Sequence, residues 1–309
     1  MRGDLMARLT RPQSPVPLGA FRIALSVVLL ARFWAMRHSI LDVYGPHGFV
    51  AWDVTRAELL PGLAHPLDLA IVLGVFGSDP IDVTYGLVGL ELMALLLLLA
   101  GITSRMAAIV AFASDYFLMR AGAGVLYGLD HFGHVALFYC MFMPVGAALT
   151  LPRWLRGAPA APATGAAGLA RRVLQLHLCI VYTSSGVEKA CGPDWWSGEA
   201  IWRALTLPDF HWLDLHVLAH WPGFAALLGW GVLALESGYA FGMFFRRTRC
   251  LWLLGVISMH LGIGLFLNLG LFAGVMLLWN LSAFGSEALE DVRAVLARCH
   301  ELHSRAQPS

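Results

Sequence analysis

The stretch PLGAFRIALSVVLLARFWAM, at residues 17–36, decides the class of fold. It holds two arginines in an otherwise apolar run, and about 20 apolar residues in a helix are enough to cross the hydrocarbon core of a bilayer. The whole chain has the same character, because 58% of its residues are hydrophobic and 13% are charged, against about 25% charged in soluble domains. We therefore expect an all-α integral membrane protein. Its first helix should be retained, because no clear small-x-small cleavage site follows it.

Further apolar runs predict about eight membrane-spanning helices in total. They lie at about 17–36, 83–101, 104–120, 131–149, 169–188, 222–244, 250–268 and 270–285. Arginine and lysine concentrate on the cytoplasmic side of membranes, and with a cytoplasmic N-terminus fourteen of them fall inside and five outside. This bias favours cytoplasmic N- and C-termini. Within the first span, Arg22 and Arg32 could reach the boundary or pair with buried acids, and for Arg32 we expect pairing.

The remaining segments complete the predicted organisation. Residues 1–285 form the transmembrane domain, and 286–309 form a cytoplasmic amphipathic tail whose helix Ser286 caps. In the outer segment 37–82, the apolar run LDLAIVLGVFG is too short to span and predicts a re-entrant or interfacial helix. The outer segment 189–221 holds five tryptophans, which favour the membrane boundary, so we expect it to form a lid.

Composition also argues against several classes of function. The net charge of +1 and the lack of a basic run give no support to nucleic-acid binding. The five cysteines form no CxxC pair, which argues against a disulfide scaffold, a cysteine zinc site and a dithiol redox centre. Nothing in the chain resembles a phosphate-binding loop, a serine triad or an HExxH motif.

Four ionisable residues lie deep inside predicted spans: Glu91, Asp115, Glu236 and His260. A helix rises about 1.5 Å per residue, which places them about 12–16 Å from a membrane boundary and is compatible with one central polar cavity. Ionisable groups at such depth often mark a functional site, but they can also simply join helices. For Glu91 and Glu236 both interpretations stay open. Tyr116 and Arg120 could supply local partners for Asp115, which favours a structural role there, whereas His260 favours a functional one.

The run VLYGLDHFGH, at 125–134, places Asp130, His131 and His134 at the outer end of the fourth span. Asp130 and His134 share a helical face, so a metal site is conceivable, but a structural zinc site needs four ligands. Asp130 is also a favoured helix N-cap residue. We expect the cap, and we predict no metal site.

Lys189 is the only lysine in a chain whose other cationic side chains are arginines. It stands in SSGVEKACGPDWWSGEA, at 184–200, near the predicted outer edge of the fifth span. Arginine keeps its proton in proteins, whereas a desolvated lysine can lose its own and act as a base or nucleophile. The choice of lysine points to proton chemistry. The alternative is that Lys189 reaches the boundary or pairs with Glu188 or Asp194.

Four stretches together carry a resemblance to a known family: FRIALSVVLLARFW at 21–34, VLYGLDHFGH at 125–134, SSGVEKACGPDWWSGEA at 184–200 and SMHLGIGLFLNLGLFAGVM at 258–276. With them, residues 18–285 resemble the HTTM group, which comprises the membrane domain of vitamin K-dependent gamma-glutamyl carboxylase and its short bacterial relatives. The GVEK element with its following tryptophan and glycine is the most specific of these features.

The resemblance implies a quinol-coupled modifying enzyme, a carboxylase- or epoxidase-like lyase in the bacterial cytoplasmic membrane with an outward-facing cavity. Lys189 matches the family's catalytic lysine, and His260 matches its histidine in the seventh span. The implied co-substrates are a reduced quinone of vitamin K type, oxygen and carbon dioxide, and the implied partners are the lipid bilayer, a quinone or lipid-like molecule and a secreted peptide. We assign the cavity lining to Glu91, Glu236, Asp115, Trp195, Trp196 and Tyr127.

Two other functions remain open. The carboxylase has an Asn-His pair shortly before LYGL, where this chain has Gly122 and Ala123. Short bacterial relatives include membrane proteins required for the maturation of secreted peptide toxins, which suggests a non-enzymatic factor for peptide maturation or export. A transporter or proton channel using Glu91, Glu236 and His260 is the third hypothesis, although the chain shows no internal repeat.

Overall fold

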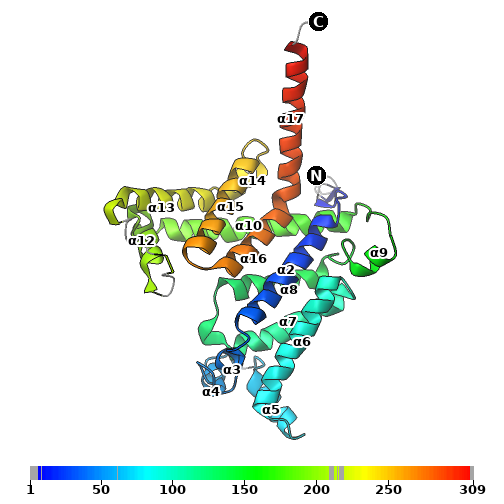
Figure 1. Ribbon diagram of the computed structural model, residues 1–309, viewed down its shortest axis with the longest axis vertical. Coiled ribbons are helices and arrows are strands. Elements are labelled where there is room, and N and C mark those ends of the chain that lie inside the picture. The colour runs from blue at the N-terminus through cyan, green and yellow to red at the C-terminus, as the bar shows by residue number, and fades with distance from the viewer. Residues whose placement is uncertain are drawn as a thin grey trace. The chain divides into compact units, whose positions relative to one another are not determined.

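Helices are the main regular secondary structure in the part of the chain that the structure describes. The computed structural model describes residues 6, 7, 9–60, 62–208, 212, 213, 215 and 219–306, with side chains as far as Cys299. Across these residues there is no strand, and one isolated bridge joins Gln13 to Thr164. The prediction of an all-α fold is therefore confirmed, as Figure 1 shows.

The helices fall into two compact units, Met1–Ala170 and Arg171–Ser309. The first unit contains α2 (Val16–Ala35), α3 (Ile40–Tyr44), α4 (Trp52–Ala57), α5 (Pro66–Gly74), α6 (Pro80–Ala100), α7 (Ser104–Ala121), the 3₁₀ turn η1 (Ala123–Val125), α8 (Gly128–Phe142), α9 (Leu151–Leu155) and the start of α10 (Gly165–Ala190). The second contains the rest of α10, α11 (Pro193–Ser197), α12 (Glu199–Thr206), α13 (Pro222–Ser237), α14 (Tyr239–Phe244), α15 (Arg249–Phe266), α16 (Gly270–Asn280), the π-helical turn η4 (Leu281–Gly285) and α17 (Ser286–Ala306).

Among the described residues, four helical stretches are long and apolar enough to cross a membrane: Val16–Ala35, Pro80–Ala100, Arg249–Phe266 and Gly270–Cys299. α13 is a shorter apolar helix. These helices mark the chain as a membrane-integral protein. Each of the ranges expected to span the membrane is largely helical in the structure.

Two of the expected ranges are interrupted. α8 ends at Phe142 because Met143, which precedes Pro144, takes an extended conformation as residues before proline do. The helix expected at 222–244 breaks at Gly238 into α13 and α14. A Cβ atom at Gly238 would lie 2.8 Å from Cζ2 of Trp252, so only glycine lets the indole pack there.

The predicted amphipathic tail has a different start from the one expected. α16 continues through η4 into α17 without a break, so Ser286 lies inside a continuous helix and does not cap it. Its buried hydroxyl has no hydrogen-bond partner among the described residues. The prediction of an N-cap at Ser286 was therefore wrong.

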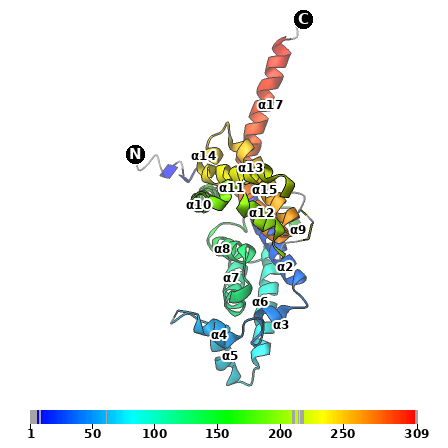
Figure 2. The ribbon, with the colours of Figure 1, turned by 90° about the vertical axis from the view of Figure 1, so that its left-hand side faces the viewer.

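In the first unit, α2 packs against α6 and α8, and α7 lies between α6 and α8 in contact with both. The side chains of Leu18, Phe21, Leu25 and Leu29 are fully buried along α2 and form its core face. Figures 1 and 2 show α3, α4 and α5 gathered at one end of α6 and α7. α5 is the short apolar helix that the sequence predicts at about this position, and it begins where His65 accepts a hydrogen bond from the backbone of Leu67.

Arg22 is fully buried and is satisfied by backbone carbonyls. Its guanidinium donates to Leu98 and Leu99, at the C-terminal end of α6, and to Val145 and Leu149 beyond α8, with distances of 2.6 Å to Leu99 and to Leu149. The last carbonyls of a helix have no intrahelical partner, and they carry partial negative charge. Arg22 therefore ties the C-terminal end of α6 and the segment after α8 to α2.

Candidate functional site

Lys189 lies in the last turn of α10 and forms a close ion pair with Glu236 of α13. Its Nζ atom is 2.6 Å from Oε2 of Glu236 and 2.6 Å from Oγ of Ser185, one helical turn earlier. Nζ also lies 5.2 Å from the ring centroid of Trp195, within the range of a cation–π contact. The two charged side chains are 23% and 9% exposed, so the pair is largely withdrawn from solvent.

The partners that the sequence suggested for Lys189 were wrong. Glu188 belongs to another face of α10, and Asp194 binds Arg203 at 3.1 Å. The actual partner, Glu236, is far away in the sequence and reaches Lys189 because α13 packs against α10. This proximity depends on Gly186, where a Cβ atom would lie 2.7 Å from Oγ of Ser237 and 2.8 Å from the carbonyl carbon of Glu236.

A second polar group, centred on Tyr182, lies on the same face of α10. The Asn280 amide donates to the Tyr182 hydroxyl at 2.8 Å, and the Tyr239 hydroxyl donates to the Asn280 oxygen at 2.7 Å. The Tyr182 oxygen lies 2.7 Å from Nε2 of His260. All four side chains are buried.

This network favours one tautomer of His260. The Tyr182 oxygen accepts from Asn280, and among the contacts of the described residues its hydroxyl proton has no acceptor other than Nε2 of His260, so donation to Nε2 satisfies both groups. A neutral imidazole that accepts at Nε2 carries its proton on Nδ1. That Nδ1 atom is buried and has no hydrogen-bond partner among the described residues, so it is available to a bound molecule.

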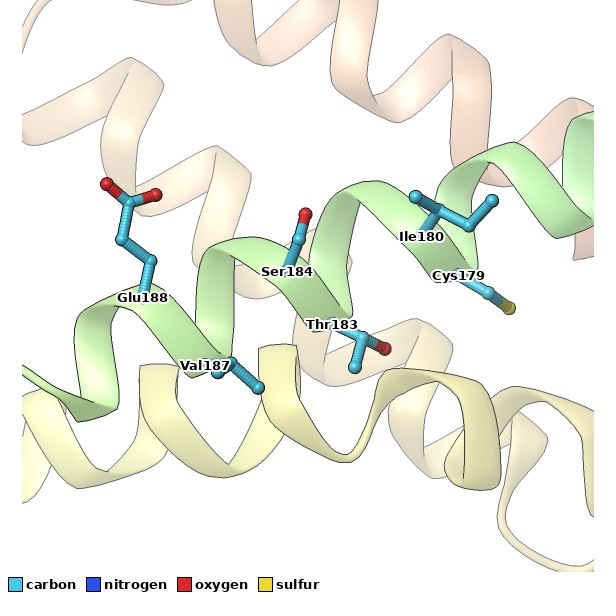
Figure 3. Close-up of a pocket in the computed structure, with 6 residues that line it drawn as sticks. All are labelled: Cys179, Ile180, Thr183, Ser184, Val187 and Glu188. Carbon is cyan, nitrogen blue, oxygen red and sulfur yellow. The ribbon is translucent and has the colours of Figure 1, made fainter.

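Together these residues form one polar face on an otherwise apolar set of helices, which we call the α10 site: Tyr182, Ser185, Lys189, Glu236, His260 and Asn280. Tyr182, Ser185 and Lys189 recur at intervals of three and four residues, which aligns them on one side of α10. A different side of α10 lines a shallow, largely apolar groove bounded by Cys179, Ile180, Thr183, Ser184, Val187 and Glu188. Figure 3 shows these six side chains leaving the helix in two rows.

A separate buried cluster lies in the first unit, and we call it the Arg32 cluster. Arg32 of α2 contacts three carboxylates, at 2.8 Å to Glu91, 2.9 Å to Asp115 and 3.1 Å to Asp130. His134 of α8 completes it, with Nδ1 2.7 Å from the second oxygen of Asp115. The prediction that Arg32 pairs with a buried acid is confirmed.

The four mid-depth residues are thus divided between the two units. Glu91 and Asp115 belong to the Arg32 cluster, and Glu236 and His260 belong to the α10 site. The local partners proposed for Asp115 were wrong, because Arg120 lies over the Tyr116 ring at 5.0 Å instead.

The expected roles of the other named residues changed in detail. Asp130 is not the N-cap of α8, but it lies in the first turn and accepts the Tyr127 N–H at 3.1 Å. Tyr127 occupies the cap position itself. Trp196 donates from Nε1 to the Ala190 carbonyl at 2.8 Å. No set of three or more His, Cys, Asp or Glu side chains in the described part of the chain could hold a metal ion.

Several residues of the two sites were not found from the sequence. Tyr182 and Ser185 share the helical face of Lys189, and their spacing in the sequence could have identified them as its neighbours. Asn280 is an amide in an apolar run, which was a second signal. Tyr239, which donates to Asn280 beside the α10 site, gave no signal of its partner, because a buried tyrosine hydroxyl can find a partner on any neighbouring helix.

The fold and the two clusters define an all-helical, membrane-integral protein with buried ionisable sites. Comparison with known proteins finds no protein-family model, no curated protein and no solved structure that matches the chain.

Proposed function

We propose that this protein is a membrane-embedded enzyme in which Lys189 and Glu236 remove a proton from a lipid-borne substrate of quinol type. The observation that supports it is the contact of 2.6 Å between Nζ of Lys189 and Oε2 of Glu236. It agrees with the resemblance of the GVEK stretch to the carboxylase family.

The ion pair gives the lysine a way to become a base. An ammonium group has no lone pair, so Lys189 must first pass a proton to another group. Glu236 is close enough to take this proton without movement of either side chain. The neutral amine then accepts the hydroxyl proton of the substrate. An arginine at this position would hold its proton and could not take part.

His260 supplies a second contact for the substrate. Its Nδ1 atom is buried and has no hydrogen-bond partner within the described part of the chain, and a quinol or quinone oxygen is an acceptor of the right kind for an Nδ1–H donor. A hydrogen bond from the Tyr182 hydroxyl to Nε2 favours this tautomer. A bound quinol supplies an acidic hydroxyl and two reducing equivalents, and the family resemblance adds oxygen and carbon dioxide as co-substrates.

The proposal includes the membrane arrangement expected from the sequence. It has eight spans, with both termini in the cytoplasm of a bacterium and the α10 site opening toward the outer face. The distribution of arginine between the two sides supports this orientation.

The test uses the purified protein in lipid nanodiscs with a reduced quinone of vitamin K type, a glutamyl peptide, oxygen and carbon dioxide. We expect quinone epoxide or a carboxylated glutamyl peptide. Lys189→Arg should reduce its formation by about a hundredfold or more, as the loss of a general base does. Arg203→Lys, an exposed cation in the same segment, is the matched control and should stay active. Undiminished turnover in Lys189→Arg would disprove the base role.

One observation favours the non-enzymatic alternative, a factor for maturation or export of a secreted peptide. At Gly122 a Cβ atom would lie 3.1 Å from the Tyr44 ring, so the position cannot accept a larger side chain without displacing it. A side chain of the family's Asn-His pair would therefore not fit at Gly122 in this packing. If peptide secretion in cells is restored equally by the wild type, Lys189→Arg and His260→Phe, the alternative is the correct function.

A further inference from the structure

The Arg32 cluster holds more negative than positive charge. One guanidinium faces three carboxylates, and the side chains of Arg32, Glu91, Asp115 and Asp130 are all at most 5% exposed. The charge would be two negative units if every acid were ionised and His134 were neutral. Isolated charge in such surroundings costs many kcal/mol, so buried acids take up protons when no cation compensates them.

The three acids are not compensated equally. Asp130 accepts from Arg32 and from the Tyr127 N–H, and it lies in the first turn of α8, where the helix dipole favours a negative charge. Asp115 accepts from Arg32 with one oxygen and contacts His134 with the other. Each of these two acids therefore has a partner on both oxygens.

Glu91 is the least compensated acid of the cluster. Its Oε1 contacts Arg32, but its Oε2 has no hydrogen-bond partner in the described part of the chain, and the side chain is 0% exposed. Oε1 of Glu91 lies 2.8 Å from one nitrogen of Arg32, and Oδ1 of Asp115 lies 2.9 Å from the same nitrogen. These two oxygens are therefore at most 5.7 Å apart. Two negative charges within this distance in a buried site disfavour each other, so the less compensated carboxylate takes up a proton.

We propose that the Arg32 cluster is a proton-binding site, in which Glu91 carries a proton at neutral pH and exchanges it with the solution through His134. Tyr44 of α3 and Tyr127 also face the cluster, and both are neutral phenols at this pH. The site is independent of the enzyme proposed above, because it uses no residue of the α10 site.

His134 is the member of the cluster through which a proton can enter. Its side chain is 19% exposed, the largest exposure in the cluster, and its Nδ1 contacts Asp115 at 2.7 Å. The ring stacks on Phe112 with centroids 4.2 Å apart, which fixes its orientation. An imidazole can take up a proton on one ring nitrogen and release one from the other, so His134 can pass a proton from the surface to the carboxylates.

Infrared spectroscopy of the full-length protein in nanodiscs tests the proposal. We expect a protonated-carboxyl C=O band at neutral pH that is lost in Glu91→Gln and kept in the matched control Asp68→Asn, an exposed acid. In deuterated buffer the band should shift more slowly in His134→Phe than in the wild type. An unchanged band in Glu91→Gln would overturn the proton on Glu91, and unchanged exchange in His134→Phe would overturn the route.

Folding of the variant also bears on the proposal. The amide of Glu91→Gln copies a neutral carboxylic acid in size and in hydrogen bonding. The variant should therefore keep the melting temperature of the wild type. Failure of Glu91→Gln to fold would count against a neutral Glu91, just as an unchanged band would.

Discussion

At the residue scale, the choice between arginine and lysine follows the chemistry of each site. Arg32 presents its planar guanidinium to three carboxylates through two separate nitrogens, which a lysine ammonium at the end of a flexible stem cannot copy. Lys189 forms a compact pair with Glu236 and can release its proton. An exchange of lysine and arginine at either position would therefore not be conservative.

His65 makes the stability of one short helix depend on pH. Burial lowers the pKa of His65 below its ordinary value of 6.5. Its Nδ1 accepts the Leu67 N–H at 3.0 Å and caps α5, which needs the neutral ring, while Nε2 contacts the Thr55 hydroxyl at 2.9 Å. The unfolded segment takes up the proton first as pH falls. The stabilisation is therefore present above about pH 6.5 and is lost as pH falls toward the folded pKa.

We expect hydrogen-exchange protection of the α5 amides to decrease between pH 7 and pH 5. In His65→Asn the side chain caps the helix without titrating, so the protection factors should be nearly independent of pH. A decrease of equal size in His65→Asn would show that another group causes it.

At the element scale, the approach of α10 to α13 is controlled by Gly186. A Cβ atom there would meet backbone atoms of Glu236 and Ser237, which cannot rotate away as a flexible side chain could. The same approach brings Glu236 to Lys189. The packing of the two helices and the assembly of the α10 site therefore both require that residue 186 has no side chain.

Gly186→Ala should destabilise the protein by about 1–3 kcal/mol, the usual cost of overpacking. It should also reduce any activity of the α10 site, because the contact between Lys189 and Glu236 lengthens. The matched control is Gly231→Ala in α13, where nothing lies within 4 Å of the new Cβ and the added methyl should be neutral or slightly stabilising. Unfolding by denaturant in detergent micelles measures both. Equal stability of the two variants would contradict the packing argument.

At the scale of the whole molecule, the proposed topology places two native cysteines on opposite sides of the membrane. Cys191 follows the fifth expected span and Cys299 follows the eighth, and both are exposed in the structure. We expect a membrane-impermeant maleimide to label Cys191 in intact cells and Cys299 only after permeabilisation. Variants that each retain a single cysteine give the measurement. Labelling of both cysteines from the same side would contradict this topology, because it would require an even number of spans between them.

Much of the local structure could be predicted from the sequence. Apolar runs of bilayer length located the helices, and the burial of Arg32 among them predicted an acidic partner. The breaks at Met143 and Gly238 were missed, because each reflects a local backbone preference or a tight contact that does not alter hydropathy. The continuous helix through Ser286 was missed because a serine before acidic residues is also the usual start of a helix.

The sequence by itself determined the class of protein, the approximate position of each helix and the unusual lysine at the end of one of them. Hydropathy and side-chain chemistry are properties of short segments, so they can be read without coordinates. Only the tertiary structure decided which polar residues meet: Lys189 with Glu236, His260 with Tyr182, and Arg32 with three acids from three other helices. These pairings depend on how helices pack, and packing is set by contacts such as those of Gly186 that join residues far apart in the chain.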